Sequence, residues 1–255
     1  MNRLQSELHR LYLPRSPAFV ETAAQASALI DPLGQVRAMV MEVTRPPSWE
    51  LLGRVWQGVQ SELELPAPAI AVSGTDGLQL WFSLAEPVMA SQAHAFLESL
   101  RMRFLPDVDA RRIRLLPAAD ALALHPERHA TLVPALQAHT GNWSAFVAAD
   151  LAPVFADTPW LDIAPNEEGQ ATLLRSLSVM KLALFEDALK RLEPTADSAD
   201  APRTHPQPGA ATADEEPKRF LLRIMNDHTV ALALRIEAAK ALLQHSNHRQ
   251  AQQSD

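Results

Sequence analysis

The sequence contains no cysteine among its 255 residues. Disulfide bonds, thiolate zinc sites and cysteine nucleophiles are therefore excluded together. It also lacks an apolar run of the roughly 20 residues that a membrane-spanning helix requires, and its N-terminus has no signal-peptide hydrophobic region. We therefore expect a cytoplasmic protein that does not associate with a membrane.

Glycine and positive charge are also in short supply. The chain has 8 glycines against 20 prolines, which predicts stiff loops, and its formal net charge is −7. A negative overall charge argues against a general nucleic-acid binder held by bulk attraction, although it leaves room for a local basic groove. The hydrophobic share of 47% is ample for a buried core.

Three segments of the chain differ in composition. Residues 1–193 carry the apolar patterns of strands and helices, and we predict an α/β (α+β) domain with a mixed or antiparallel central sheet flanked by helices. Residues 194–217 contain Ala, Pro, Asp and Thr but no large apolar residue, which predicts a disordered linker. Residues 218–246 regain helical periodicity. They predict a small helical unit that must dock on the main domain or on a protein partner to bury its apolar face.

The strongest local signal in the main domain is a hairpin over residues 69–87. Apolar and polar residues alternate there around a turn whose Gly74 and Gly77 can take positive φ, and Asp76-Gly77 is a strong hairpin signal. A strand over 36–43 and a helix capped by Ser48 precede it. The remaining predictions are helices over 2–12 and 19–30, a helix from a Ser91 cap to Phe104, a strand over 111–116, short helices between 118 and 139, and one long helix over 170–192.

The hairpin carries the pattern Ser73-Gly74-x-x-Gly77-Leu-x-Leu-Trp-Phe-x-Leu, in which Gln79 is the residue between the first two leucines. This pattern resembles the second motif of the archaeo-eukaryotic primase superfamily, in which a histidine contacts the phosphates of the incoming nucleotide. Gln79 stands at the position of that histidine. The resemblance implies a primase-polymerase-like fold with a nucleotide-binding site at Ser73, Gly74, Gly77 and Gln79. From the residues alone, the alternative is a plain turn followed by an outward-facing glutamine.

The same superfamily uses an Asp-x-Asp pair, on the strand before the hairpin, and a third carboxylate on a later strand to hold divalent metal ions. The positions of the pair are occupied here by Val40 and Glu42, of which only the second can bind a metal ion. Asp107 and Asp109 are the nearest candidates for the third carboxylate. They precede a run over 111–117 that is similar to the Arg-x-Arg-Leu-Pro pattern of bacterial primase-polymerase relatives. The resemblance therefore implies that Glu42, Asp107 and Asp109 bind Mg²⁺ or Mn²⁺ if a nucleotidyltransferase site remains.

Basic residues gather between positions 101 and 114. Five arginines and two aspartates give this segment a net charge of +3, in contrast to −7 for the whole chain. Such a segment predicts a groove for a nucleic-acid backbone, formed by Arg101, Arg103, Arg111, Arg112 and Arg114. The alternative is that these arginines pair with the excess of acidic residues. For Glu42, the alternative to a metal ligand is a lone carboxylate at a strand end, or a partner of Arg37 or Arg114.

Other catalytic patterns are missing from the sequence. Pro126 separates His125 from His129, and no third ligand completes a zinc site. There is no P-loop, no dinucleotide-binding glycine fingerprint and no nucleophile elbow.

Residues 219–243 are similar to a short helical motif at the ends of phage terminase small subunits and of phage-related bacterial proteins. Together, the two resemblances favour a degenerate, non-catalytic and nucleic-acid-associated protein of the primase-polymerase type, encoded by a mobile element or phage remnant. One alternative is an atypical metal-dependent nucleotidyltransferase. The other is a protein-interaction module without a role in nucleic-acid binding.

Overall fold

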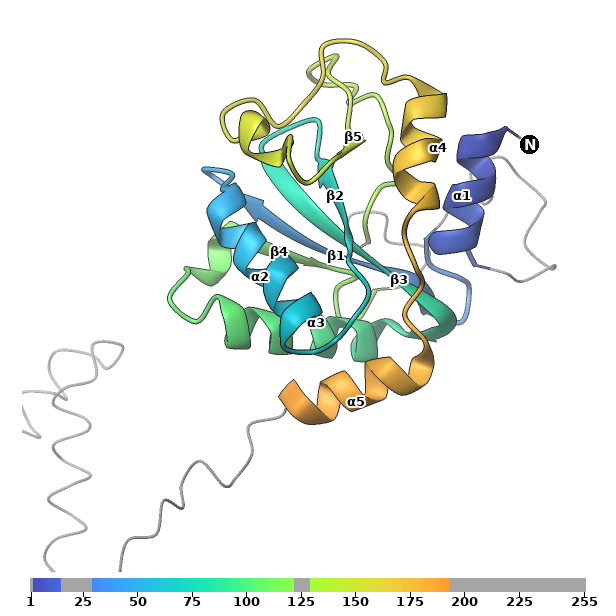
Figure 1. Cartoon of the computed structure of the whole chain (residues 1–255), viewed down its shortest axis with the longest axis vertical. Coiled ribbons are helices and arrows are strands. Elements are labelled where there is room, and N and C mark those ends of the chain that lie inside the picture. The colour runs from blue at the N-terminus through green and yellow to red at the C-terminus, as the bar shows by residue number, and fades with distance from the viewer. Residues whose placement is uncertain (1, 15–28, 122–128, 193–255) are drawn as a thin grey trace, which may run out of the picture. The chain divides into compact units, whose positions relative to one another are not determined.

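The computed structural model describes residues 2–14, 29–121 and 129–192 (Figure 1). They belong to the first of two compact units, Met1–Ala196 and Asp197–Asp255. The linker predicted over 194–217, the helical unit predicted over 218–246 and most of the helix predicted over 19–30 lie outside the described residues. Within the part of the chain that is described, no helix is long and apolar enough to cross a membrane.

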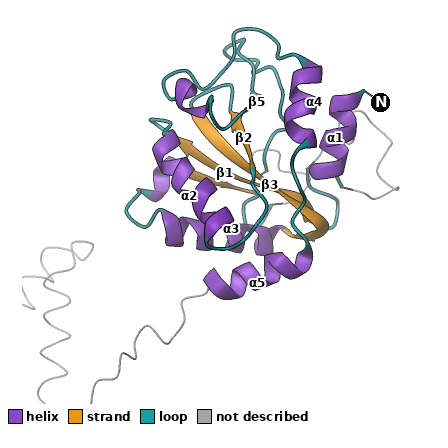
Figure 2. Ribbon diagram, viewed as in Figure 1, coloured by secondary structure: helices purple, strands orange, loops and turns teal. Residues whose placement is uncertain are grey.

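Five antiparallel strands form the centre of the domain (Figure 2). Their order across the sheet is β4-β1-β3-β2-β5. The strands are β1 (Gln35–Thr44), β2 (Ala69–Val72), β3 (Gly77–Met89), β4 (Ile113–Leu116) and β5 (Ala145–Val147). The predicted hairpin is β2 and β3, and the strand predicted over 36–43 is β1. The prediction of an α/β domain with helices around an antiparallel sheet is therefore confirmed.

Helices cover both faces of this sheet. They are α1 (Arg3–Leu11), α2 (Trp49–Ser61), α3 (Ala90–Phe104), α4 (Glu167–Arg175) and α5 (Leu182–Leu192), with two short 3-10 turns, η3 (Ala110–Arg112) and η5 (Ala152–Phe155). Side chains along a strand alternate between faces, and β1 divides the core in this way. Met39, Met41 and Val43 belong to the apolar cluster with α2, α3 and α5, whereas Ala38 and Val40 belong to the cluster with α1 and α4.

A buried arginine fixes α1 to the sheet. Arg37 is 1% exposed and lies at a break in the register of β1 with β3. Its guanidinium donates hydrogen bonds of 2.8 to 3.1 Å to the backbone carbonyl oxygens of His9, Arg10, Leu13 and Leu84. A buried cation is tolerated when its donors are satisfied, so these bonds hold the end of α1 against the two central strands.

At the β5 edge of the sheet, a glutamine side chain takes the place of a neighbouring strand. The Gln170 amide of α4 accepts from the Phe146 N–H through Oε1 at 2.7 Å and donates to the Phe146 carbonyl oxygen through Nε2 at 2.9 Å. Both Gln170 and Phe146 are buried. The outward backbone groups of the middle residue of β5 are therefore satisfied by a side chain.

Residues 170–192 form parts of two helices, so the prediction of one long helix is wrong. Between α4 and α5, the Met180 N–H donates to the Ser83 oxygen and the Ala85 N–H donates to the Met180 oxygen, both at 2.8 Å. β2 pairs with β3 only as far as Trp81, and the next backbone groups along that edge of β3 need partners. The Met180 backbone supplies them, which interrupts an otherwise continuous helical stripe.

Two predicted boundaries are also wrong, each because a nearby side chain closes a turn. α3 begins one residue before Ser91, so Ser91 is not its N-cap, and the Gln92 side chain accepts from the Met89 N–H at 3.2 Å. β4 begins at Ile113 rather than two residues earlier. The Asp109 side chain accepts from the Arg111 N–H at 2.9 Å and stabilises η3 at this point.

Candidate functional site

Three polar side chains from adjacent strands meet on the sheet face that carries α1 and α4. The register pairs Glu42 of β1 with Gln79 of β3 on one side and with Arg114 of β4 on the other. Residues that are paired across antiparallel strands point to the same face and have Cβ atoms about 5 Å apart. The sheet therefore joins side chains that lie as many as 72 residues apart in the chain.

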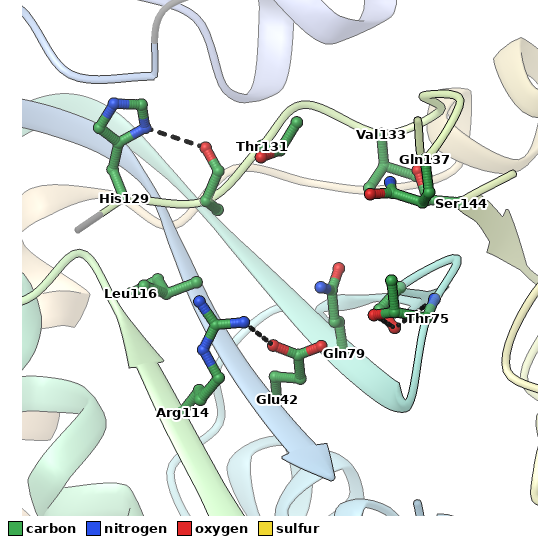
Figure 3. Close-up of a pocket in the computed structure, with 12 residues that line it drawn as sticks. Glu42, Thr75, Gln79, Arg114, Leu116, His129, Thr131, Val133, Gln137 and Ser144 are labelled. Carbon is green, nitrogen blue, oxygen red and sulfur yellow. Dashed lines mark hydrogen bonds and ion pairs between the residues drawn. The ribbon is translucent and has the colours of Figure 1, made fainter. Parts of the chain in front are cut away.

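These side chains form one wall of a cavity of about 220 Å³. Ser73, at the end of β2, belongs to the same wall. The opposite wall comes from residues 129–144, which include His129, Thr131, Gln137 and Ser144. Figure 3 shows the two sets of side chains facing each other across the cavity.

The opposite wall is a loop that folds back on itself. Leu136 and Trp143 form an isolated antiparallel bridge, and the Ser144 N–H donates to the Ala135 oxygen at 2.9 Å. Gly141 has a φ of +75° in the turn between them, a conformation that favours glycine. The prediction of short helices between 118 and 139 is wrong for the residues that the structure describes there, because these cross-loop bonds take up the backbone groups.

Glu42 is the only carboxylate among the described residues that line the cavity. Its side chain is 2% exposed, and its Oε2 lies 3.3 Å from Nη1 of Arg114, whose side chain is 57% exposed. Burial raises the pKa of Glu42. Arg114 and hydrogen bonds with Gln79 and Ser73 act in the opposite direction, whereas Asp76 adds to the rise. The net result is a carboxyl group that loses its proton less readily than an exposed glutamate.

A glycine makes room for this carboxylate. A Cβ atom at Gly77 would lie 2.4 Å from Oε1 of Glu42 and 2.9 Å from its Cδ. On the same face, the Oε1 atom of Gln79 accepts from the Trp81 indole N–H at 2.8 Å. Gln79 is buried and lines the cavity, so the alternative of an outward-facing glutamine is wrong.

The turn between β2 and β3 uses its own backbone amides. Ser73 Oγ accepts from the N–H groups of Thr75 at 3.1 Å and of Gly77 at 2.9 Å, and the Gly74 N–H donates to the Pro159 oxygen at 3.0 Å. These three amides are therefore not open to a phosphate group. Of the four residues predicted to bind a nucleotide, Ser73 and Gln79 line the cavity, whereas the two glycines serve the turn and the packing of Glu42.

The three carboxylates predicted to bind a metal ion do not come together. Oδ1 of Asp107 lies 3.4 Å from Nη1 of Arg54 in α2, and Asp109 caps η3. Neither aspartate lines the cavity with Glu42. Val40 is fully buried in the apolar cluster under α1 and α4. Among the described residues, no group of three or more His, Asp or Glu side chains could hold a metal ion. The donor set does not fit the metal site that the resemblance implies.

Acidic neighbours and backbone groups engage three of the five arginines predicted to contact nucleic acid. Arg101 pairs with Glu98 at 2.6 Å and Arg103 pairs with Glu62 at 2.9 Å. Arg112 donates to a backbone carbonyl oxygen in the loop after β1 at 2.8 Å. For the first two, and for Arg114 with Glu42 at 3.3 Å, the structure has the ion pairs that the sequence offered as the alternative to a basic groove.

The remaining two arginines keep donors available. Arg111 is exposed and has no ion pair with another described residue, and Arg114 pairs only with Glu42 in this part of the chain. Of the five, Arg114 alone lines the cavity. Of these five arginines, Arg111 and Arg114 therefore carry the positive charge that can attract an anion. They lie at the start and in the middle of residues 111–117.

Sequence reasoning missed one whole wall of the cavity. His129, Thr131 and Gln137 lie in a region for which the sequence predicts short helices, and Ser144 is part of no predicted site. No spacing marks such residues, because loop bonds between distant positions place them opposite the sheet. The one available signal was Gly141, which follows a polar stretch and permits a tight turn.

Comparison of the chain with protein-family models gives no match, and comparison with curated proteins gives none either.

Proposed function

We propose that this cavity binds a nucleotide or the end of a single-stranded nucleic acid, and that the chain does not transfer nucleotidyl groups. In this proposal the protein is a diverged member of the primase-polymerase type whose site serves for binding. The observation that carries the proposal is the cross-strand row of Arg114, Glu42 and Gln79 at one cavity. Glu42 and Gln79 are the positions that the resemblance relates to the first and second motifs of that superfamily.

The same row argues against catalysis. Nucleotidyl transfer by two metal ions needs several carboxylates that hold the cations beside the phosphates. Here Glu42 is the only carboxylate among the described lining residues, and Arg114 already lies 3.3 Å from it. A guanidinium in this position competes with a cation for the carboxylate. Binding is therefore proposed to be independent of Mg²⁺ and Mn²⁺.

The decisive experiment measures binding and turnover on the full chain. Calorimetric titration with a nucleoside triphosphate, with and without Mg²⁺ or Mn²⁺, is combined with a primer-extension assay under the same conditions. We expect binding that does not change when the metal ion is removed, and no incorporation of nucleotide. Gln79→Ala should weaken binding about tenfold, because one hydrogen bond of roughly 1 kcal/mol and the placement of Glu42 are lost. Gln60→Ala, on the α2 face of the sheet, is the matched control.

Two results would contradict the proposal in different ways. Incorporation by the wild-type chain that disappears in Glu42→Ala would establish the atypical nucleotidyltransferase. Absence of binding to every nucleotide and single strand, at any salt concentration, would leave the protein-interaction module, for which deletion of residues 218–246 should abolish capture of a partner.

Nucleic-acid binding through the basic segment has a test of its own. The affinity for a single-stranded oligonucleotide should fall with salt, and each phosphate contact contributes a slope of about 0.7. Arg111→Gln should reduce the slope by roughly one such contact. Arg101→Gln should leave the slope unchanged, because the Arg101 side chain is only 14% exposed and is held by two hydrogen bonds to Glu98. Equal slopes in all three proteins would remove Arg111 from the interface.

A further inference from the structure

The cavity contains hydrogen-bonding groups that no described residue uses. The side chains of Thr131 and Gln137 line it without a hydrogen bond to another described side chain or backbone group. His129 engages only Nδ1, which lies 3.0 Å from the Ala130 oxygen, so its Nε2 atom stays available. These groups come from the loop wall and face Arg114 and Glu42 on the sheet wall. A polar ligand between the two walls would satisfy both.

The two partners of the ion pair on the sheet wall, Arg114 and Glu42, differ strongly in their exposure to solvent. Glu42 is almost fully buried beside Gln79, its partner in the register of β1 with β3, whereas more than half of the Arg114 side chain is exposed. Arg114 can therefore turn to another anion at small cost, because an exposed guanidinium stays solvated on its free side. Glu42 cannot leave, because it is enclosed by the strands and by Gly77.

We propose that the cavity binds a phosphate monoester through Arg114, and that Glu42 takes up one proton when the phosphate binds. The ion pair of Arg114 passes from Glu42 to the phosphate, and solvent supplies the proton that neutralises the carboxylate. This inference rests on the proposed function, since the phosphate is that of a free nucleotide or of a 5′ end.

A phosphate monoester fits this chemistry better than a carboxylate. A guanidinium binds either anion through two parallel N–H···O bonds. The available donors on the opposite wall add a hydroxyl and an amide, which require more acceptor oxygens than a carboxylate offers after it has bound Arg114. A dianion beside an ionised, buried Glu42 would be strongly repelled at low local dielectric. Protonation of Glu42 removes that repulsion and gives the carboxyl group a hydrogen-bond donor.

Three other charged or titratable groups lie around Glu42 and must be separated from it in the test. Arg114 faces it from β4, Asp76 acts on it from the turn before β3, and His129 lines the loop wall. Asp76 itself pairs with Arg45 at 2.7 Å. Protonation of His129 would also favour phosphate at low pH, so a His129 variant is required.

The experiment measures affinity and proton uptake by calorimetry in two buffers with different ionisation enthalpies. The probes are inorganic phosphate, adenosine 5′-monophosphate, adenosine, and a short oligodeoxythymidylate with either a 5′-phosphate or a 5′-hydroxyl. Above the pKa of Glu42, the wild-type affinity for a phosphate probe should fall about tenfold for each pH unit, relative to Glu42→Gln. Comparison with this variant cancels the ionisation of the phosphate, which has its second pKa near 6.

The variants give opposite expected results. Glu42→Gln should bind the phosphate probes more tightly at neutral pH and should take up about one proton fewer than the wild type. Arg114→Gln should lose tenfold or more in affinity, in line with the loss of a charge-assisted pair. His129→Gln should keep the pH dependence of the wild type. Arg54→Gln, which breaks an exposed pair on the α2 face, is the control.

The outcomes separate the inference from the proposed function. Equal proton uptake by wild type and Glu42→Gln, or unchanged phosphate binding by Arg114→Gln, would overturn the inference. If adenosine binds as well as adenosine 5′-monophosphate, the nucleotide site stands and the phosphate exchange fails. If inorganic phosphate binds with proton uptake and no nucleotide or oligonucleotide binds, the exchange stands and the nucleotide function fails. Preference for the 5′-phosphorylated oligonucleotide over the mononucleotide identifies the strand end as the source of the phosphate.

Discussion

Arg37 on β1 and Arg114 on the edge strand β4 show how differently one sheet can use the same side chain. Arg37 is buried and donates to four backbone carbonyl oxygens, in α1, in β3 and at Leu13 just after α1. Arg114 lies on β4 with one carboxylate at 3.3 Å and more than half of its side chain in solvent. The donors of Arg37 are satisfied by backbone oxygens, whereas Arg114 keeps donors that face solvent. Saturation of the donors therefore separates an anchor from a binding group.

The largest effect is expected from removal of the anchor. Arg37→Met keeps the length of the side chain but leaves four backbone carbonyl oxygens without their donor. We expect the free energy of unfolding to fall by about 3 kcal/mol, measured as a lower urea midpoint. Arg54→Met, at an exposed pair, should change it by less than about 0.5 kcal/mol. Similar losses in the two variants would show that Arg37 is not an anchor.

The space above Gly77 gives the next largest effect. Gly77→Ala places a Cβ atom 2.4 Å from the Glu42 carboxylate, so the carboxylate must move within a closed site. Overpacking of this kind costs about 1–3 kcal/mol. In a Glu42→Ala background the same change should cost much less, and a double-mutant cycle from urea unfolding measures the difference. If the losses in free energy of unfolding are additive, the absence of a side chain at Gly77 does not serve to accommodate Glu42.

The contribution of Glu42 to the free energy of unfolding depends on pH. Its pKa is raised above that of the unfolded chain, mainly by burial, so the protonated form favours the fold. This contribution is complete below the unfolded pKa of about 4.3 and is lost as pH rises through the folded pKa. Glu42→Gln should therefore match the wild type in acid and become more stable than it at higher pH. The difference grows by about 1.4 kcal/mol for each pH unit between the two pKa values. A pH-independent difference would contradict this account.

The smallest effect is expected where both partners of a pair are exposed. The side chains of Arg103 and Glu62 are 62% and 48% exposed. Arg103→Gln should change the free energy of unfolding by less than about 0.5 kcal/mol, and added salt should reduce the difference further. A loss comparable to that of Arg37→Met would remove the contrast between surface and buried arginines.

The sheet wall of the site could be predicted from sequence because strand alternation and hairpin register are local signals. Once β1 and the hairpin are recognised, Glu42 and Gln79 fall on one face. The loop wall could not be predicted, because bonds such as that between Ser144 and Ala135 join residues with no periodic pattern. The role assigned to Asp109 also failed, since a short side chain that caps its own turn does not reach a distant site.

The Gln170 side chain has a consequence for the behaviour of the protein in solution. An uncovered edge strand is a template on which a second chain can add its own strand, and this is a common route to aggregation. At β5 the outward N–H and C=O groups of Phe146 are already occupied by one primary amide. Gln170 thus acts as a terminator of sheet growth. A single side chain protects one border of the sheet against self-association.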